Sequence, residues 1–263
     1  MPRFAANLSM MYPEHALPDR VGAAARDGFA AVEVQSPYEV DAAELRRALD
    51  AARCPLVLMN AAGGNASRGE RGLAALPGRE PDFREAVALG LDYARAVRAT
   101  RVHVMAGLPP AGARDVDVRA TYVNNLRHAC DLFAPHGIEV LIEPINTRDM
   151  PGYWLNFQQQ AADVIDEVDR PNLGLQMDFY HLQIMEGDLI RHLRQFFSFV
   201  RHVQVAGVPE RHEPDTGEVD FGAIFAALDR LGYCGWVGCE YRPARGVLAG
   251  GTSAGLDWIR RLV

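Results

Sequence analysis

The chain has 263 residues, 49% of them hydrophobic, so it is long enough to bury a large core and suits a single domain over residues 1–263. Its formal charge is −7 and it has no basic run, which argues against nucleic acid as a partner, because nucleic-acid affinity depends on Lys and Arg side chains that neutralise phosphates. All 27 basic residues are arginine, and the absence of lysine excludes Schiff-base, pyridoxal-phosphate and Walker-type chemistry, each of which needs a lysine amine.

Strand-like and helix-like segments alternate along the whole sequence. The strand-like segments are short and rich in apolar and β-branched residues, and they cover residues 3–7, 30–34, 55–60, 101–105, 137–144, 173–178, 201–206 and 235–240. The helix-like segments cover residues 13–27, 81–98, 118–135, 158–168, 180–199, 221–231 and 253–262. One further helix begins at Asp41, the expected N-cap, with Glu44 at the capping-box position.

Eight strand–helix units in sequence predict an α/β fold, a (β/α)8 TIM barrel made of a single domain. A doubly wound open sheet is the alternative, and it is disfavoured because no GxGxxG motif follows the first strand. The longest irregular segment, residues 61–80, has the length of a functional loop. We expect it to close over the barrel mouth together with residues 10–12.

The sequence also bears on where the protein works. No run approaches the apolar length that spans a bilayer, and the first residues lack a signal-peptide pattern, so we expect no membrane partner. The four cysteines form no CxxC pair, and three of them lie in apolar strand or helix patterns. Reduced, buried thiols are typical of a cytoplasmic protein, which is the expected location. The sequence allows a homo-oligomer and does not fix the number of copies.

Oxygen-bearing side chains recur at or near the C-terminal ends of the last four strand-like segments. They are Glu143, Asp178, Gln204 and Glu240. The C-terminal strand ends of a barrel converge on one mouth, where inward-facing side chains from different strands meet. Three carboxylates that close could not all stay ionised without a cation between them, and hard oxygen ligands suit Mg²⁺ or Mn²⁺. We therefore expect one divalent cation there, although His202 shares a strand face with Gln204 and is the more usual ligand type.

Several longer motifs carry a resemblance to a known family. Residues 4–10 (FAANLSM), 69–72 (GERG) with 76–80 (LPGRE), 143–146 (EPIN) and 235–241 (GWVGCEY) resemble the hydroxypyruvate isomerase family, which includes the 2-oxo-tetronate isomerases and belongs to the xylose-isomerase-like barrels. The resemblance covers essentially the whole chain. It implies Glu143, Asp178, Gln204 and Glu240 as ligands of the divalent metal, with Glu143 and Glu240 as the proton donor and acceptor. It also favours Gln204 over His202, since related sugar epimerases carry histidine at the ligand position and this family carries glutamine.

The resemblance implies an enzyme that moves a carbonyl between adjacent carbons of a small hydroxy-keto acid through an enediolate. Residues 143–152 and 178–187 look like hydroxypyruvate isomerases, which form 2-hydroxy-3-oxopropanoate, and this is the reaction that we expect first, with the following two as alternatives. Residues 102–107 and 205–214 look like the 2-oxo-tetronate enzymes, which form 3-oxo-tetronate, and a ketose 3-epimerase would use the same chemistry. We expect His181 to hydrogen-bond a substrate oxygen and Arg211 to bind the substrate carboxylate through its planar fork.

Two other classes compete with this interpretation. An abasic-site DNA endonuclease has a similar barrel, but it needs a histidine-rich three-zinc centre and a basic DNA-facing surface, and the acidic balance of this chain argues against both. A binding protein or an inactive descendant would have no use for a carboxylate cluster that is costly to hold together.

Overall fold

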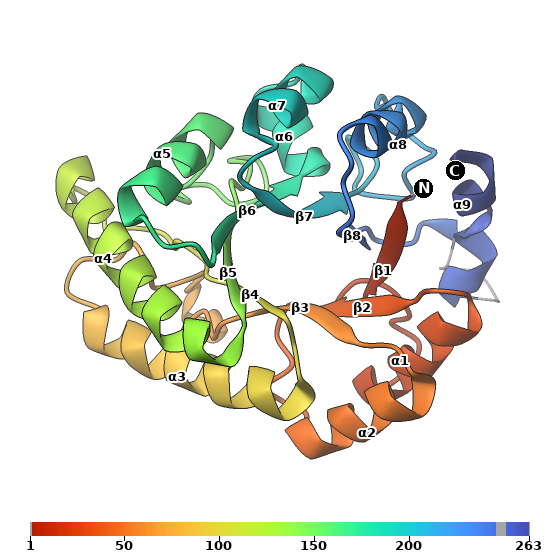
Figure 1. Cartoon of the computed structure of the whole chain (residues 1–263), viewed down its shortest axis with the longest axis horizontal. Coiled ribbons are helices and arrows are strands. Elements are labelled where there is room, and N and C mark those ends of the chain that lie inside the picture. Colours follow the sequence, from red (N-terminus) through yellow and green to blue (C-terminus); the bar gives the residue numbers. More distant parts are fainter. Residues whose placement is uncertain (1, 246–250, 263) are drawn as a thin grey trace.

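The computed structural model describes residues 2–245 and 251–262. Within those residues, eight parallel strands close into a barrel in sequence order, and helices surround it (Figure 1). The strands are β1 (Arg3–Asn7), β2 (Ala31–Val34), β3 (Leu56–Asn60), β4 (Arg101–His103), β5 (Glu139–Ile142), β6 (Leu173–Asp178), β7 (Val200–Val205) and β8 (Trp236–Cys239). β1 pairs with β8 as well as with β2, which closes the ring. The predicted (β/α)8 TIM barrel is therefore confirmed.

The helices agree with most of the predicted segments. They are α1 (Leu17–Arg26), α2 (Ala42–Ala52), α3 (Glu80–Val97), α4 (Asp115–Phe133), α5 (Gln158–Val168), α6 (Phe179–Met185), α7 (Leu189–Phe196), α8 (Phe221–Arg230) and α9 (Asp257–Leu262). Asp41 caps α2 as predicted, because its Oδ1 accepts the backbone N–H of Glu44 at 3.0 Å. None of the helices in the described ranges combines the length and the hydropathy that a bilayer crossing requires.

Two helix predictions were wrong in detail. Residues 180–199 form α6 and α7 rather than one helix, because Gly187 and Asp188 between them adopt φ values of 65° and 45°, which end a right-handed helix. Residues 253–262 divide into the 3₁₀ helix η4 (Gly251–Gly255) and α9. The first break matters for the site, since it confines α6 to a short helix directly after β6.

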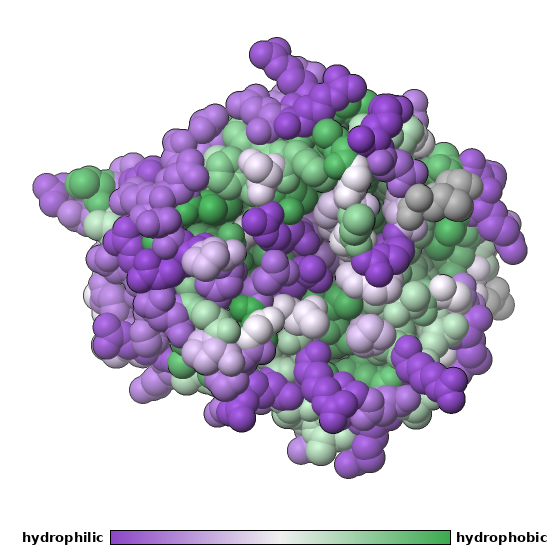
Figure 2. Space-filling view, viewed as in Figure 1, coloured by the Kyte–Doolittle hydropathy of each residue, from purple (hydrophilic) through white to green (hydrophobic). Residues whose placement is uncertain are grey.

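The hydrophobic core lies between the barrel and the helices. Apolar side chains on the outer face of the strands, such as Val102 and Val140, belong to one buried cluster with helix residues such as Leu45, Val87 and Leu126. Figure 2, drawn in the same view as Figure 1, shows hydrophilic residues at the centre and along the outer edge of the face, with hydrophobic residues between them. The main apolar cluster therefore lies outside the barrel, and a small second one is formed by Ala5, Ala31 and Val57 with Trp236 packed against them.

The barrel interior is polar where it approaches the mouth. Asn7, Glu33, Gln176, His202 and Gln204 are all at most 2% exposed. Gly238 on β8 makes room for this layer, because a Cβ atom at Gly238 would lie 2.1 Å from Oε1 of Glu33. A polar layer of this kind is stable only if its members satisfy one another's hydrogen bonds.

The loop after β3 is fastened to the strand end of β4. Gly72 forms an isolated antiparallel bridge with Ala106, and the two backbones approach so closely that a Cβ at Gly72 would lie 2.5 Å from the carbonyl oxygen of Met105. Gly107 is under the same constraint, since its Cβ would lie 2.4 Å from the carbonyl oxygen of Gly72. Both glycines have positive φ. The contact fixes where the loop leaves the mouth, and Glu70 and Arg71 line the cavity just before it.

Candidate active site

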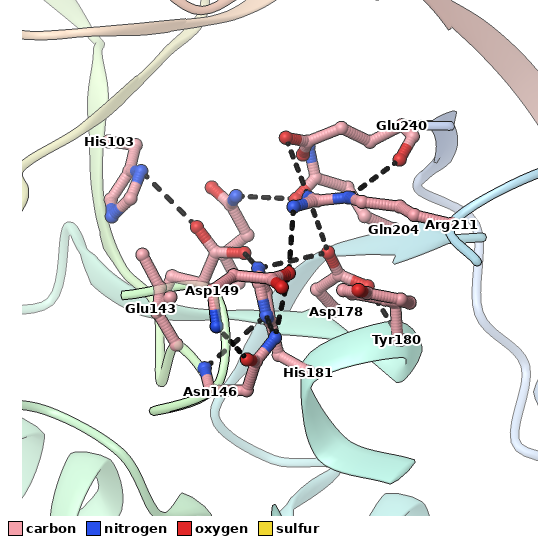
Figure 3. A network of polar contacts seen from close by, with 12 residues as sticks. His103, Glu143, Asn146, Asp149, Asp178, Tyr180, His181, Gln204, Arg211 and Glu240 are labelled. Carbon is pink, nitrogen blue, oxygen red and sulfur yellow. Dashed lines mark hydrogen bonds and ion pairs between the residues drawn. The ribbon is translucent and has the colours of Figure 1, made fainter. Parts of the chain in front are cut away.

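Three of the expected residues meet at the C-terminal mouth of the barrel. Ligand atoms of Glu143, Asp178 and His181 all lie within 4.8 Å of one another, and all three residues are buried (Figure 3). Glu143 directly follows β5, Asp178 ends β6, and His181 lies on the first turn of α6. The C-terminal ends of β5 and β6 and the first turn of α6 therefore position this corner of the site.

Asp178 has a structural role and a free oxygen. Its Oδ1 accepts the backbone N–H of Tyr180 at 2.8 Å, so it is the N-cap of α6. Its Oδ2 is buried without a hydrogen-bond partner among the described residues, and it lies 3.6 Å from Nε2 of His181. A buried carboxylate oxygen left without a donor is costly unless a cation or a ligand reaches it.

His181 is oriented by Asn146. The backbone N–H of Asn146 donates to Nδ1 of His181 at 3.3 Å, and Nδ1 also lies 2.6 Å from Nδ2 of Asn146. Because a backbone N–H can only donate, Nδ1 is the acceptor, and the proton of the neutral ring is on Nε2. Burial first, and then Arg211 and His103, lower the pKa of His181 well below its ordinary value. His181 is thus neutral, and its Nε2 lies 3.6 Å from Oδ2 of Asp178 and 3.8 Å from Oε1 of Glu143, beyond hydrogen-bond distance of either carboxylate.

Glu240 completes the carboxylate group from β8. Its Oε1 accepts a hydrogen bond from NH2 of Arg211 at 3.0 Å and another from Nε2 of Gln35. The same Arg211 nitrogen lies 3.6 Å from Oδ2 of Asp178, and NH1 lies 3.8 Å from Oδ2 of Asp149. Arg211 therefore lies among three carboxylates of the protein. These already balance the charge of its guanidinium, which a substrate carboxylate would otherwise do.

Burial dominates the electrostatics of the three acids. It raises the pKa of Glu240 to about 8 and the pKa of Asp178 to about 6, while Arg211 opposes both shifts. Burial also raises the pKa of Glu143 well above its ordinary value, and the neighbouring Glu240 and Asp178 raise it further. One guanidinium thus does not offset three buried carboxylates, and a second positive charge would favour their ionised forms.

Gln204 lies one layer below these residues. Its Nε2 donates to Oε2 of Glu33 at 2.9 Å, and its Oε1 accepts from Nε2 of Gln176 at 2.6 Å. It borders a small cavity of about 20 Å³, as Glu143 and Glu240 do, while His202 on the same strand contacts Glu33 and does not border that cavity.

A larger cavity of about 590 Å³ opens above the carboxylates. Its inner wall includes Glu143, His181, Arg211 and Glu240. Its outer wall includes Arg71, in the loop after β3, and Arg242, in the loop after β8. No carboxylate of the described residues lies within ion-pair distance of either arginine.

Several residues of the site were not anticipated. Glu33, His103 and Asp149 contact or border the carboxylate group, and none was proposed as a site residue. A signal for Glu33 is present in the sequence, since it is the one charged residue in the otherwise apolar strand β2. His103 ends β4, 3.5 Å from Glu143, and burial lowers its pKa to about 3. Asp149 lies in the loop after β5, where the sequence carries no comparable pattern.

Comparisons with known proteins agree with this architecture. A family model described as a xylose isomerase-like TIM barrel matches residues 21–262. The chain is 55% identical to a 2-oxo-tetronate isomerase from Cupriavidus necator, over 99% of this chain and 98% of that protein. It is 41% identical to a hydroxypyruvate isomerase from Escherichia coli, over 98% of each. It also matches the crystal structure of a protein from Brucella melitensis named AP endonuclease, family 2, with a TM-score of 0.94, 44% identity and 99% coverage of both chains.

These matches far exceed what a shared fold alone produces, because two independent isomerase relatives align over nearly the full length. The chain belongs to the xylose isomerase-like TIM barrel family and, within it, is an isomerase of the hydroxypyruvate isomerase type.

Proposed function

We propose that the protein isomerises a small hydroxy-keto acid by moving one carbon-bound proton through an enediolate. The observation that carries this proposal is that Glu143 and Glu240 border the same cavity from non-adjacent strands, with the pKa of each raised by burial. Two carboxyl groups on different sides of one cavity can take a proton from one carbon and return it to the next. Burial brings the pKa of metal-free Glu240 to about 8, and a bound cation would lower it toward a physiological operating pH, where a group can both accept and donate.

The residues present fit a divalent cation. Asp178 Oδ2 is a buried oxygen without a donor, and it lies with Glu143 in a cluster spanning less than 4.8 Å. We propose Glu143, Asp178 and Glu240 as carboxylate ligands, with the carbonyl oxygen of Gln204 as a fourth, a donor set that suits Mg²⁺ or Mn²⁺. When bound, such an ion acts as a Lewis acid that stabilises the negative charge of the enediolate. His181, which carries its proton on Nε2, serves as a donor to a substrate oxygen.

The substrate carboxylate needs cations that the protein has not already neutralised. Arg211 is surrounded by Glu240, Asp178 and Asp149, so it serves chiefly to balance the acids and to contact the substrate near the reacting carbons. Arg71 and Arg242 lie farther out along the same cavity. We propose that they bind the carboxylate end of the substrate, in addition to Arg211, which the sequence predicted for this role.

Two substrates fit this chemistry. The relative from Cupriavidus necator, at 55% identity, is named a 2-oxo-tetronate isomerase, and the relative from Escherichia coli, at 41%, a hydroxypyruvate isomerase. We therefore rank 2-oxo-tetronate above hydroxypyruvate, which reverses the order that the sequence motifs gave. A nuclease function, which the name of the Brucella melitensis protein suggests, is disfavoured because the net charge is −7 and carboxylates dominate the inner cavity.

The test is a turnover assay on purified protein stripped with a chelator. Rates on 2-oxo-tetronate, hydroxypyruvate and a ketose are compared before and after adding Mg²⁺ or Mn²⁺, with abasic-site DNA as a parallel substrate. The proposal expects metal-restored isomerisation of the acids and incorporation of solvent deuterium at the substrate carbon. Turnover without any exchange would favour a hydride shift, and cleavage of DNA without isomerisation would refute the proposal.

A further inference from the structure

Beneath the carboxylates, one buried acid receives hydrogen bonds from three neighbours. Glu33 is 1% exposed, and its two oxygens contact Nδ2 of Asn7 at 3.2 Å, Nε2 of Gln204 at 2.9 Å and Nε2 of His202. Asn7 comes from β1, which pairs directly with β2, whereas Gln204 and His202 come from β7, which does not pair with β2. Glu33 therefore ties distant strands together at the floor of the site.

This arrangement determines how the amide of Gln204 is turned. A carboxylate oxygen accepts hydrogen bonds and does not donate, so each partner must present an N–H to Glu33. The amide nitrogen of Gln204 thus faces Glu33, and its oxygen faces away. That oxygen accepts one hydrogen bond from Gln176 and keeps a second lone pair, as a carbonyl has two.

The proposed function needs this free lone pair to face the site. Glu33, Gln204, Glu143 and Glu240 all border the cavity of about 20 Å³ under the mouth. If Glu33 did not hold the amide, the nitrogen and oxygen of Gln204 could exchange places, and an amide nitrogen with its two protons cannot bind a cation. Gly238 supports the arrangement, since any larger residue there would displace Oε1 of Glu33.

We propose that Glu33 is the positioning residue that keeps the amide oxygen of Gln204 turned toward the site and so sets the affinity for the divalent cation. The inference rests on the proposed function, because it assumes that a cation binds there. Glu33 itself makes no contact with the substrate in this role. Residues that orient metal ligands in this way typically change metal affinity by about 10- to 100-fold when they are altered.

The experiment measures Mn²⁺ binding by calorimetry, without substrate. Glu33→Gln keeps the shape of the side chain but lets it donate as well as accept, so we expect the Mn²⁺ dissociation constant to rise by about 10- to 100-fold. The matched control is Glu213→Gln, another acid that is 1% exposed, whose oxygens accept the backbone N–H groups of Ala244 and Arg245 outside the site. We expect the control to bind Mn²⁺ like the wild type.

A double variant tests the direction of the hydrogen bond itself. Glu33→Gln/Gln204→Glu reverses donor and acceptor, conserves the charge and again presents an oxygen to the cavity, so it should regain the affinity that Glu33→Gln loses. This variant also decides the matter if Glu33→Gln alone does not fold. Wild-type affinity in a folded Glu33→Gln protein, or a folded double variant that still binds about 10-fold or more below wild type, would overturn the inference. Absence of Mn²⁺ and Mg²⁺ binding to the wild type would instead overturn the metal part of the proposed function.

Discussion

The two ends of strand β5 carry the same side chain in opposite settings. Glu139 begins the strand, is partly exposed, and pairs with Arg101 at 2.9 Å and Arg201 at 3.7 Å. Glu143, four residues later on the same face, is buried with Asp178 and Glu240 around one guanidinium. Cations outnumber the acid at the first end, and acids outnumber the cation at the second. In a (β/α)8 barrel, residues at the N-terminal ends of the strands contribute to stability, and residues at the C-terminal ends form the active site. The two ends of β5 differ in charge balance in line with these two roles.

The largest expected effect is on kcat, and it distinguishes substitutions at the two ends of β5. Glu143→Gln and Glu240→Gln should each lower kcat by about 10²- to 10⁴-fold, because each removes a general acid or base while preserving shape. Glu139→Gln, on the same strand as Glu143, should leave kcat unchanged. Initial rates on 2-oxo-tetronate with Mn²⁺, together with circular dichroism to confirm folding, provide the measurement. Full activity in either mouth variant would remove that residue from the proton-transfer step.

A second prediction concerns the cations at the outer wall of the cavity. Arg71→Ala should raise the KM for the keto acid by about 10-fold or more, since a charge-assisted hydrogen bond contributes about 1.5 to 3 kcal/mol. The KM for an uncharged ketose of equal length should not change. Arg68→Ala is the control, because Arg68 lies in the same exposed loop but does not line this cavity. An equal effect on charged and uncharged substrates would assign Arg71 to loop structure.

The third prediction uses the pH dependence of stability in the metal-free protein. Burial raises the pKa of Glu240 to about 8 and that of Glu143 well above its ordinary value, so between about pH 7 and 8 the native state binds more protons than the unfolded chain. The free energy of unfolding must then fall as pH rises through this window, by up to about 1.4 kcal/mol per pH unit for each group. Below that window His103 and His181, whose pKa burial lowers, act in the opposite sense.

Denaturant titrations at several pH values within the window set by the acids, with a chelator present, check this slope. Glu240→Gln should flatten it, and saturating Mn²⁺ should reduce it, because the bound ion favours the ionised carboxylates. A slope of the opposite sign would show that the acids are ionised without the metal.

The smallest effect is expected at the bottom of the barrel. Glu139→Gln should lower the free energy of unfolding by about 1 kcal/mol or less, since a partly exposed ion pair is well screened. Its effect should shrink further in high salt. A loss of several kcal/mol would mean that Arg101 and Arg201 are left as uncompensated, partly desolvated charges when Glu139 is neutralised.

Much of the fold could be predicted from the sequence, because alternation of strand and helix is a local property. The eight strand segments each carry their own apolar signature, and Asp41 marks the start of α2 by its own side chain. The break between α6 and α7 was missed because the helical pattern continues on both sides of Gly187 and Asp188. Only the positive φ values of those two residues reveal it.

The site was partly predictable for a different reason. Asp178 ends β6, and Glu143 and Glu240 directly follow β5 and β8, so topology alone brings them together. Glu33 could not be placed in the same way, since whether an acid in a short strand points inward depends on register and on the space left by Gly238. Nor could the surroundings of Arg211 be predicted, because the loop that carries it has no repeating pattern from which contacts follow.

The fastening of the loop after β3 has a consequence for protein engineering. Its anchor, where Gly72 and Gly107 pass each other without room for a side chain, is separate from the exposed tip over residues 64–69. Residues 64–69 can therefore be replaced by a segment of different length or charge, while the contact between Gly72 and Gly107 keeps the new loop positioned above the cavity. Selectivity among acids of different chain length is open to redesign there, without a change to any barrel strand.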